Sequence, residues 1–366
     1  MSKIMQYPFK LIYQVYAPAK VNLWLDIVGV RSDGYHLLST VMQTIGMADQ
    51  LTVFIGSTEF PKLITSDSLN NVGAGVDQHE KWPLSYTQVA VVGNTVLNVS
   101  DRVITDSALL NCAVEDNLIV KAAQQFLQLA SELDVPRIKE EHHFICLDLI
   151  KNIPAQAGLG GGSSDAAAVL RVLNDYFQVN ATQTGAIALH QLASRIGADV
   201  PFALVGGTAH CTGIGEVIDA LSPMDPLPIL LMKPDYAVAT GTAFRTWRQV
   251  SQQAGESLRR PDVTTGLAAL KKRDYKSLAM ASENVFEPVI ATLYPEFTNQ
   301  FSAMVKQSPL LARMSGSGSV IFGIFSDQQS CDSAKSILED SDATAGCQFW
   351  STHLLPRLPD FSIYFL

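Results

Sequence analysis

Residues 154–165, which read PAQAGLGGGSSD, are the stretch that decides the fold. Four of the five positions 158–162 are glycine, which permits tight turns and a close approach of the backbone to a ligand. Ser163, Ser164 and Asp165 can each cap the alanine-rich helix that we expect after the loop. The free N–H groups and the positive dipole end of such a helix attract anions. The stretch therefore predicts a phosphate-binding loop that opens a helix.

The loop differs from the phosphate loops that have well-known signatures. It lacks the Gly-Lys-Ser/Thr ending of a Walker A motif, and a dinucleotide G-x-G-x-x-G spacing would end on Ser163. The chain has no VAIK, HRD or DFG motif of a protein kinase, and no G-x-S-x-G elbow of a serine hydrolase. Glycine content alone would also fit a flexible loop capped by serines. The prediction therefore rests on the whole run GLGGGSS directly before a helix, which is more specific.

Strands and helices are expected on both sides of the loop. Residues 15–27 alternate apolar with polar side chains, which predicts a strand with one face in the core, interrupted at Pro18. Residues 32–34 (Ser-Asp-Gly) predict a turn. Further strands are expected at 50–55, 144–150, 229–232 and 320–325, and helices at 116–130, 166–177, 184–196, 240–253, 262–270 and 274–280.

The length of 366 residues is typical of about two domains. Residues 221–228 (LSPMDPLP) hold three prolines and predict a linker, so we expect domains at 1–222 and 223–366. Residues 57–110 are rich in Asn, Ser, Gly and Thr and contain short alternating runs. They predict a β-rich insertion in the first domain, with a flexible excursion as the alternative.

Composition excludes several classes of protein. With 47% hydrophobic and 17% charged residues, the chain is not composed like a disordered protein, and a net charge of −9 argues against a nucleic-acid binder. Five scattered cysteines without a CxxC pair predict free thiols in a reducing compartment. We find no HExxH or Cys/His cluster for a structural metal, no secretory signal and no membrane span, and expect a cytoplasmic protein.

Three blocks of the chain are similar, in order, to those of the GHMP kinase superfamily, which includes galactose, homoserine, mevalonate and phosphomevalonate kinases. They are Ala17-Pro-Ala-Lys20-Val-Asn22-Leu, residues 154–167, and Met314-Ser-Gly-Ser-Gly318. The resemblance covers most of the chain except residues 57–110 and the extreme C-terminus. It implies a two-domain α+β fold, ATP as phosphoryl donor with Mg²⁺, and a small-molecule alcohol as acceptor. Three further strings, at 31–36, 115–119 and 197–201, resemble the branch whose acceptor carries a cytidine diphosphate.

Phosphoryl transfer to an alcohol needs a positioned hydroxyl, neutralised phosphate charge and a group that takes the proton. Asp199 is the candidate base, since it lies in a Gly-Ala-Asp-Val-Pro turn whose apolar neighbours could partly desolvate it. Lys20 is its candidate partner, and the resemblance implies the same two catalytic roles. Outside these matching blocks each would more simply be a solvated surface charge.

The resemblance also implies the residues that bind each ligand. ATP is expected at Pro154, Ala155, Gln156, Ala157, Gly158, Leu159, Gly160, Gly161, Gly162, Ser163 and Ser164. Asn22, Tyr35 and His36 match the family's substrate-binding residues, and Tyr35 offers an aromatic face for a cytosine ring. Phe244 is the candidate second face, with an ordinary core phenylalanine as the equal alternative.

Two glycines and one serine complete the expected site. Gly316 and Gly318 are expected to form a tight turn beside the glycine loop, although a hairpin turn before the strand at 320–325 explains them equally well. No acidic pair stands out as a dedicated Mg²⁺ ligand set, and Ser164 is the candidate ligand.

Two other functions stay open at the level of sequence. The chain could act on mevalonate, phosphomevalonate or homoserine, against which the Asp-Gly-Tyr-His and Gly-Ala-Asp-Val-Pro strings argue. It could also be a non-catalytic relative that binds a ligand, which the loss of Lys20 or Asp199 would have favoured; both are present.

Overall fold

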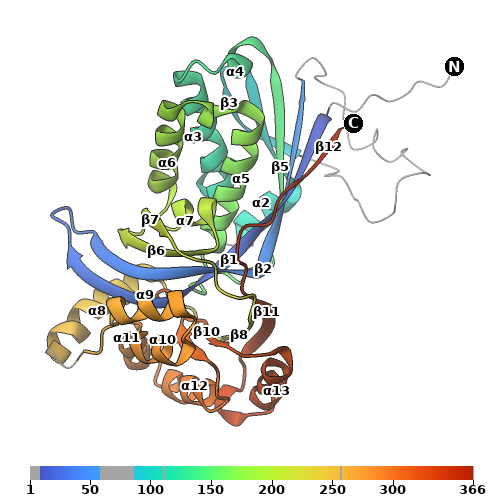
Figure 1. The fold of residues 1–366 in the computed structure, drawn as a ribbon. Coiled ribbons are helices and arrows are strands. Elements are labelled where there is room, and N and C mark those ends of the chain that lie inside the picture. The colour runs from blue at the N-terminus through green and yellow to red at the C-terminus, as the bar shows by residue number, and fades with distance from the viewer. Residues whose placement is uncertain (1–8, 58–85, 110–111, 256–257, 366) are drawn as a thin grey trace.

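A long antiparallel hairpin passes from one lobe of the fold into the other (Figure 1). The computed structural model describes residues 9–57, 86–109, 112–255 and 258–365. Strands β1 (Phe9–Val30) and β2 (His36–Ser57) form this hairpin, and the predicted turn at 32–34 lies between them. Val15 and Ala17 of β1 pack in the core of the first lobe, whereas Leu25 and Ile27 pack in the core of the second.

The predicted strand at 15–27 is confirmed within β1, but its expected burial on one face is wrong. Val21 and Leu23 are fully buried as predicted, yet Trp24 and Asn22 on the other face are buried as well. The reason is that the second lobe covers this other face; the Trp24 ring lies against Gly266 of α9 (Val263–Lys272). The strand continues through Pro18, next to which its register with β2 shifts.

The first lobe contains an eight-stranded sheet, counted over the described residues, with the order β12-β1-β2-β5-β4-β3. β6 pairs with residues 38–43, in the N-terminal half of β2, and β7 pairs with β6. The bounds of these strands are β3 (Tyr86–Val92), β4 (Thr95–Ser100), β5 (His143–Ile150), β6 (Thr208–Gly213), β7 (Val217–Ala220) and β12 (Ser362–Phe365). The strands predicted at 50–55 and 144–150 are thereby confirmed.

Part of the expected insertion is built into this sheet. β3 and β4 form a hairpin, β4 runs parallel to β5, and Leu97 and Val99 are fully buried in the lobe's core. The short alternating runs in this region therefore form strands, as the prediction of a β-rich insertion expects. Residues 58–85 of the expected insertion lie outside the described residues.

Helices cover one face of the first sheet (Figure 1). They are α2 (Asp101–Leu109), α3 (Leu118–Glu132), α4 (Pro136–Glu140), α5 (Gly161–Phe177), α6 (Gln183–Ile196) and α7 (Val200–Val205), with 3-10 turns at η1 (Val114–Asp116) and η2 (Val179–Ala181). The helix expected from residue 116 begins at Leu118, because the Asn117 side chain accepts a hydrogen bond from the Ile119 N–H and caps it.

Among the residues that the structure describes, the second lobe is built on a four-stranded antiparallel sheet of order β11-β8-β10-β9. Its strands are β8 (Pro228–Lys233), β9 (Leu311–Met314), β10 (Ile321–Ile324) and β11 (Gln348–His353). Its helices are α8 (Thr240–Ala254), α9, α10 (Tyr275–Ala281), α11 (Glu287–Leu293), α12 (Glu296–Val305) and α13 (Gln328–Glu339), with the 3-10 turn η4 (Asp342–Thr344). The elements predicted at 229–232, 240–253, 262–270, 274–280 and 320–325 are confirmed within two residues at each end.

The predicted linker lies between the two lobes. Residues 221–227 carry neither helix nor strand, although β8 already begins at Pro228. The division at 222 stays a prediction. One part of the C-terminal half lies across it, since β12 pairs antiparallel with β1 in the first lobe's sheet.

No helix in the described part of the chain is both long enough and apolar enough to cross a lipid bilayer.

Candidate active site

The glycine loop joins the end of β5 to the start of α5, as predicted from its sequence. Gly158 and Gly160 have positive φ angles of 75° and 70°, which non-glycine residues rarely adopt. A Cβ atom at Gly158 would lie 2.1 Å from the carbonyl oxygen of Ser315. Glycine is therefore required at position 158 both by its backbone angle and by the close approach of a second chain segment.

The expected capping of α5 by Ser163, Ser164 or Asp165 is wrong. The N-cap is Gly160, and no side chain among the described residues bonds the first turn. The reason is that the helix begins earlier, which places the three polar residues inside it. The N–H groups of this first turn thus remain available to a ligand, and the dipole end favours an anion there.

Ser164 and Asp165 use their side chains for the interior of the protein instead. The Ser164 hydroxyl donates to the carbonyl of Pro18 at 2.7 Å, and its residue is 4% exposed. This hydroxyl holds α5 against β1. Ser164 as a Mg²⁺ ligand stays a prediction, for a hydroxyl whose hydrogen is already bonded to a backbone carbonyl.

The turn between β9 and β10 lies directly beside the glycine loop, as predicted for Gly316 and Gly318. The Ser315 hydroxyl donates to the Gly158 carbonyl at 2.8 Å, and the Val320 N–H donates to the Ala157 carbonyl at 3.2 Å. The turn is also a β9–β10 hairpin connection, so both explanations of the two glycines hold.

Lys20 and Asp199, which are far apart in sequence, meet beneath the loop. Lys20 Nζ lies 3.3 Å from Asp199 Oδ2, and it donates to Asn22 Oδ1 at 2.7 Å. The Asn22 amide donates in turn to the Thr40 hydroxyl at 2.8 Å, which anchors this row of polar groups to β2. A Cβ atom at Gly160 would lie 3.1 Å from the Lys20 side chain and 3.5 Å from Asp199, so the pair lies against the loop.

The position of Asp199 follows from two short helices. Gly197 ends α6, and Asp199 is the N-cap residue of α7, whose second residue is Pro201. No described N–H of α7 bonds the Asp199 carboxylate as a cap, so the side chain is directed to Lys20 instead. The pairing agrees with the prediction of Lys20 as the partner of Asp199, which rested on the family resemblance because nothing local links residues 20 and 199.

The predicted acceptor residues lie near the hairpin turn. Tyr35 is 58% exposed, and the Arg31 guanidinium lies 5.3 Å from its ring centre. The rings of His36 and Phe244 are 4.7 Å apart and tilted by 35°. Burial lowers the pKa of His36, with the Arg248 charge as a smaller cause, so its ring is neutral near pH 7.

One cavity of about 1070 Å³ connects these groups. Its lining includes the proposed catalytic pair, the four proposed acceptor residues and every predicted nucleotide-binding residue except Ser164. A cavity of this size exceeds the range typical of one drug-sized ligand. It has room for two substrates beside Lys20 and Asp199.

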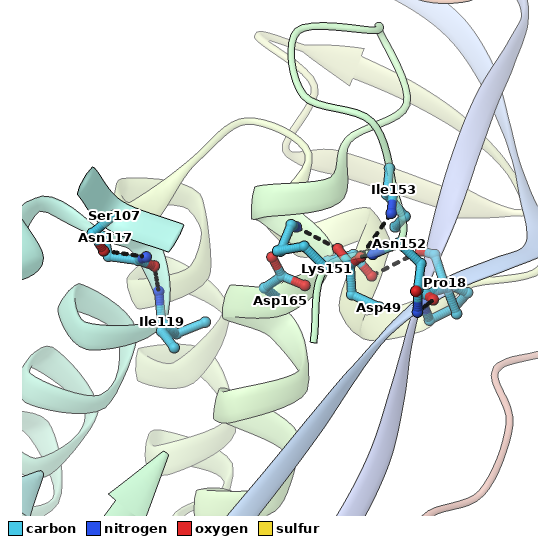
Figure 2. A network of polar contacts seen from close by, with 11 residues as sticks. Pro18, Asp49, Ser107, Asn117, Ile119, Lys151, Asn152, Ile153 and Asp165 are labelled. Carbon is cyan, nitrogen blue, oxygen red and sulfur yellow. Dashed lines mark hydrogen bonds and ion pairs between the residues drawn. The ribbon is translucent and has the colours of Figure 1, made fainter. Parts of the chain in front are cut away.

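A buried ionic cluster next to the loop was missed by sequence reasoning. Figure 2 shows Lys151 between the carboxylates of Asp49 and Asp165, with its Nζ 2.6 Å from Asp165 Oδ2 and bonded to Asp49 Oδ2. Asp49 also accepts hydrogen bonds from the backbone N–H groups of Asn152 and Ile153. The cluster fixes the exit of β5 to the start of α5. Its only sequence signal is charged residues at otherwise apolar positions.

Potential metal ligands are dispersed in the described part of the chain. It contains no group of three or more His, Cys, Asp or Glu side chains that could hold an ion.

Comparisons with known proteins agree with this arrangement. The model of the GHMP kinases N terminal domain matches residues 117–207, and that of the GHMP kinases C terminal domain matches residues 267–342. The chain is a GHMP kinase with the two-domain α+β fold of that class. It is 33% identical to the 4-diphosphocytidyl-2-C-methyl-D-erythritol kinase of Clostridium tetani over 87% of this chain and 93% of that protein. The kinase of the same name from Desulfitobacterium hafniense is 31% identical over 94% and 96%. The chain thus belongs to the 4-diphosphocytidyl-2-C-methyl-D-erythritol kinase family.

Solved structures give the same result. A crystal structure of 4-(cytidine 5'-diphospho)-2C-methyl-D-erythritol kinase superposes with a TM-score of 0.64 at 27% identity, covering 93% of this chain and 98% of the other. A homoserine kinase from Cytophaga hutchinsonii superposes with a TM-score of 0.62 at 15% identity, which shows a shared fold alone.

Proposed function

We propose that this protein transfers the γ-phosphoryl group of ATP to the 2-hydroxyl of 4-diphosphocytidyl-2-C-methyl-D-erythritol, in the non-mevalonate route to isoprenoid precursors. One observation carries the proposal. The Lys20 and Asp199 side chains, 3.3 Å apart, lie between the glycine loop and the Tyr35–Phe244 end of the same cavity. A base thus lies between a site that fits phosphates and a site that fits an aromatic base.

The glycine loop fits the triphosphate of ATP. Gly158 and Gly160 let the loop backbone turn closely against Ser315 and Lys20, and the first turn of α5 has N–H groups without a described side-chain cap. We assign the nucleotide to residues 154–163, and we exclude Ser164 because its hydroxyl is bonded to Pro18. ATP supplies the phosphoryl group and Mg²⁺ neutralises part of its charge; the backbone donors of the loop orient the phosphates.

The chemistry requires a proton acceptor at the attacking hydroxyl. The acceptor oxygen forms a bond to the γ-phosphorus, the bond to the ADP oxygen breaks, and the hydroxyl proton passes to Asp199. Lys20 pairs with the Asp199 carboxylate at 3.3 Å and offers a donor to the reacting oxygen. Asn22 holds the Lys20 ammonium in place through the 2.7 Å bond to its amide oxygen.

The acceptor's cytosine is assigned to the end of the cavity near Tyr35. Tyr35 offers an exposed ring face for stacking, and the neutral His36 ring can exchange hydrogen bonds with a base. Phe244 contacts His36 on one side and packs edge-on to Phe286 at 4.9 Å on the other. We therefore assign two roles to Phe244: it supports the His36 ring, and it lines the site for the cytosine.

The proposed partners are small molecules, with no nucleic acid and no membrane. The net charge of −9 disfavours contact with a polyanion. We place the enzyme in the cytoplasm, because its five cysteines are all free thiols, as in a reducing compartment.

An ADP-release assay with a panel of alcohols tests the proposal. The purified chain is given ATP and Mg²⁺ with 4-diphosphocytidyl-2-C-methyl-D-erythritol, mevalonate, phosphomevalonate, homoserine or buffer. We expect release above the buffer rate with the cytidine-bearing alcohol alone. Release with mevalonate, phosphomevalonate or homoserine instead would assign the chain another acceptor, and release with none would favour a non-catalytic ligand-binding role.

A further inference from the structure

Residues 282–286 join α10 to α11, which begins at Glu287, and this connection lies against β1. The Leu25 N–H of β1 donates to the Glu283 carbonyl at 3.0 Å, and the Val285 N–H donates to the Leu25 carbonyl at 3.1 Å. The same strand β1 carries Lys20 and Asn22 five and three residues earlier. This connection is thus fixed to the strand that bears the proposed catalytic lysine.

Asn284, in the centre of this connection, directs its side chain at the turn between β9 and β10. Its residue is 2% exposed. Its Nδ2 donates to the carbonyls of Met314 at 2.8 Å and Gly316 at 2.9 Å, and its Oδ1 accepts from the Phe286 N–H at 2.9 Å. Both amide hydrogens of Asn284 therefore hold backbone carbonyls of this one turn.

Glu287 holds the same turn from a second side. Its Oε1 accepts a hydrogen bond from the Met314 N–H at 3.0 Å. Met314 is thereby bonded at its N–H by Glu287 and at its carbonyl by Asn284. We call Asn284 and Glu287 together the turn clamp.

The turn held by the clamp is the one that contacts the glycine loop. Ser315 donates to the Gly158 carbonyl, and Cβ atoms built at Gly158 and Gly316 would each meet the other segment. A Cβ atom at Gly316 would also lie 3.5 Å from Lys20 Nζ. A displacement of the turn would therefore change the positions of both the glycine loop and the Lys20 side chain.

We propose that Asn284 and Glu287 are positioning residues of the phosphate half of the site. They fix the turn at 314–318, which contacts the glycine loop at Ala157 and Gly158. Neither is among the described residues that line the cavity, so they act through the turn and not by touching a substrate. The inference rests on the proposed function, in that it assigns the glycine loop to ATP.

The first test compares Asn284→Asp with Gln43→Glu. The aspartate keeps the acceptor for the Phe286 N–H and replaces the donor to two carbonyls by an oxygen. Gln43 is a close match: it is fully buried, donates to the Thr44 and Leu355 carbonyls at 2.7 and 2.8 Å, and accepts from Thr208 at 2.6 Å. Gln43 and its three partners, Thr44, Thr208 and Leu355, are all absent from the described residues that line the cavity.

Affinity for ATP is measured by calorimetric titration in the absence of the alcohol. The KM values for ATP and for the alcohol are measured in the ADP-release assay. We expect Asn284→Asp to weaken ATP binding by about tenfold and to leave the KM for the alcohol within about twofold, since the aspartate still accepts from the N–H of Phe286, which packs on Phe244. Gln43→Glu should lower the melting temperature and leave ATP binding unchanged. An Asn284→Asp protein with wild-type ATP affinity, or with both substrates weakened equally, overturns the proposal.

A second pair of variants covers the case in which Asn284→Asp does not fold. Glu287→Gln keeps an acceptor for the Met314 N–H, whereas Glu287→Met removes it at similar volume. We expect Glu287→Met to lose ATP affinity and Glu287→Gln to retain it; equal affinities in the two variants would contradict the clamp. The titration needs no acceptor, so an incorrect choice of alcohol would show as absent turnover in the wild type and leave this comparison intact.

Discussion

At the residue scale, Lys20 and Asp199 differ from an ordinary surface ion pair in their surroundings. The Lys20 side chain is 9% exposed and that of Asp199 is 28% exposed. A lysine so buried needs a partner for its charge, and it has both Asp199 and the Asn22 amide oxygen. Asp199 keeps an open side, which a substrate hydroxyl can approach. The more buried member thus orients the more accessible one.

Replacement of Asp199 by asparagine separates catalysis from binding. The variant keeps the shape of the side chain but loses the group that takes the proton, so we expect kcat to fall by about 10²- to 10⁴-fold. Stopped ADP-release measurements give kcat, and calorimetric titration with ATP should give wild-type affinity. Asp340→Asn, an exposed aspartate outside the cavity lining, is the control. A kcat within a few-fold of wild type for Asp199→Asn would mean that another group takes the proton.

At the element scale, α5 and the two segments at its N-terminus form one unit. The loop before the helix requires glycine where the turn at 314–318 approaches it, and Ser164 inside the helix bonds to Pro18 of β1. The Lys151 cluster closes the same unit from the β5 side (Figure 2). The phosphate site is therefore held by β1, β5 and the β9–β10 turn together.

Gly158→Ala tests the approach of the turn to the loop. The new Cβ would lie 2.1 Å from a backbone oxygen, which cannot rotate away, so the loop must move. We expect ATP affinity to fall by more than tenfold, which is a loss of more than about 1.4 kcal/mol of binding free energy. Gly93→Ala is matched in its positive φ of 55° but has open space around it, so it should cost only roughly 1–2 kcal/mol of stability. Titration with ATP and chemical denaturation separate the two effects; equal ATP affinity in both variants would exclude the steric argument.

Asp165 makes stability depend on pH. Burial raises its pKa to about 8, the Asp49 carboxylate adds to this, and the Lys151 charge opposes it. The folded protein therefore holds a proton that the unfolded chain has released above about pH 4. Stability is lost as the pH rises from about 4 to about 8, by at most about 1.4 kcal/mol per pH unit.

The Asp165→Asn variant should remove this dependence. The amide keeps the shape of the side chain and does not titrate, while Asp49 still pairs with Lys151. Denaturant unfolding at pH 5, 6, 7 and 8 should show a smaller decrease of the unfolding free energy than in wild type. Asp340→Asn, at an exposed position, should keep the wild-type slope. Identical slopes for Asp165→Asn and wild type would show that the folded protein holds no extra proton at Asp165.

What the sequence could predict about these elements depends on how local each signal is. The GLGGGSS run identified the loop and the start of α5, because glycine content and a following helix are local properties. The contact of Gly158 with Ser315, the pairing of Lys20 with Asp199 and the Lys151 cluster join residues more than a hundred positions apart, except for Lys151 with Asp165. The family resemblance supplied the roles of Lys20 and Asp199; the missed cluster had no motif to show it.

At the scale of the whole molecule, the chain crosses between the lobes more than once. The β1–β2 hairpin carries residues of both cores, and after β11 the chain returns to the first lobe (Figure 1). Along this return Leu355 donates its N–H to the Thr44 carbonyl at 2.8 Å, and the Arg171 side chain donates to the Pro359 carbonyl at 2.8 Å. A boundary drawn at the proline-rich stretch could not show this crossing, because β12 is four exposed residues without an alternating pattern.

Phe361 is the residue through which the returning segment joins the first core. Its ring lies edge-on to Tyr13 of β1 at 5.6 Å, and the Arg171 guanidinium lies 5.7 Å from its centre. We expect Phe361→Ala to lower the unfolding free energy by about 1–3 kcal/mol, since it removes a partly buried aromatic group. Phe361 is not among the described residues lining the cavity, so both KM values should stay unchanged. Phe365→Ala, the same substitution at 82% exposure four residues on, should leave stability unchanged. Denaturant unfolding of the two variants decides the matter: equal losses would mean that β12 pairing, and not the Phe361 contact, joins this segment to the first lobe.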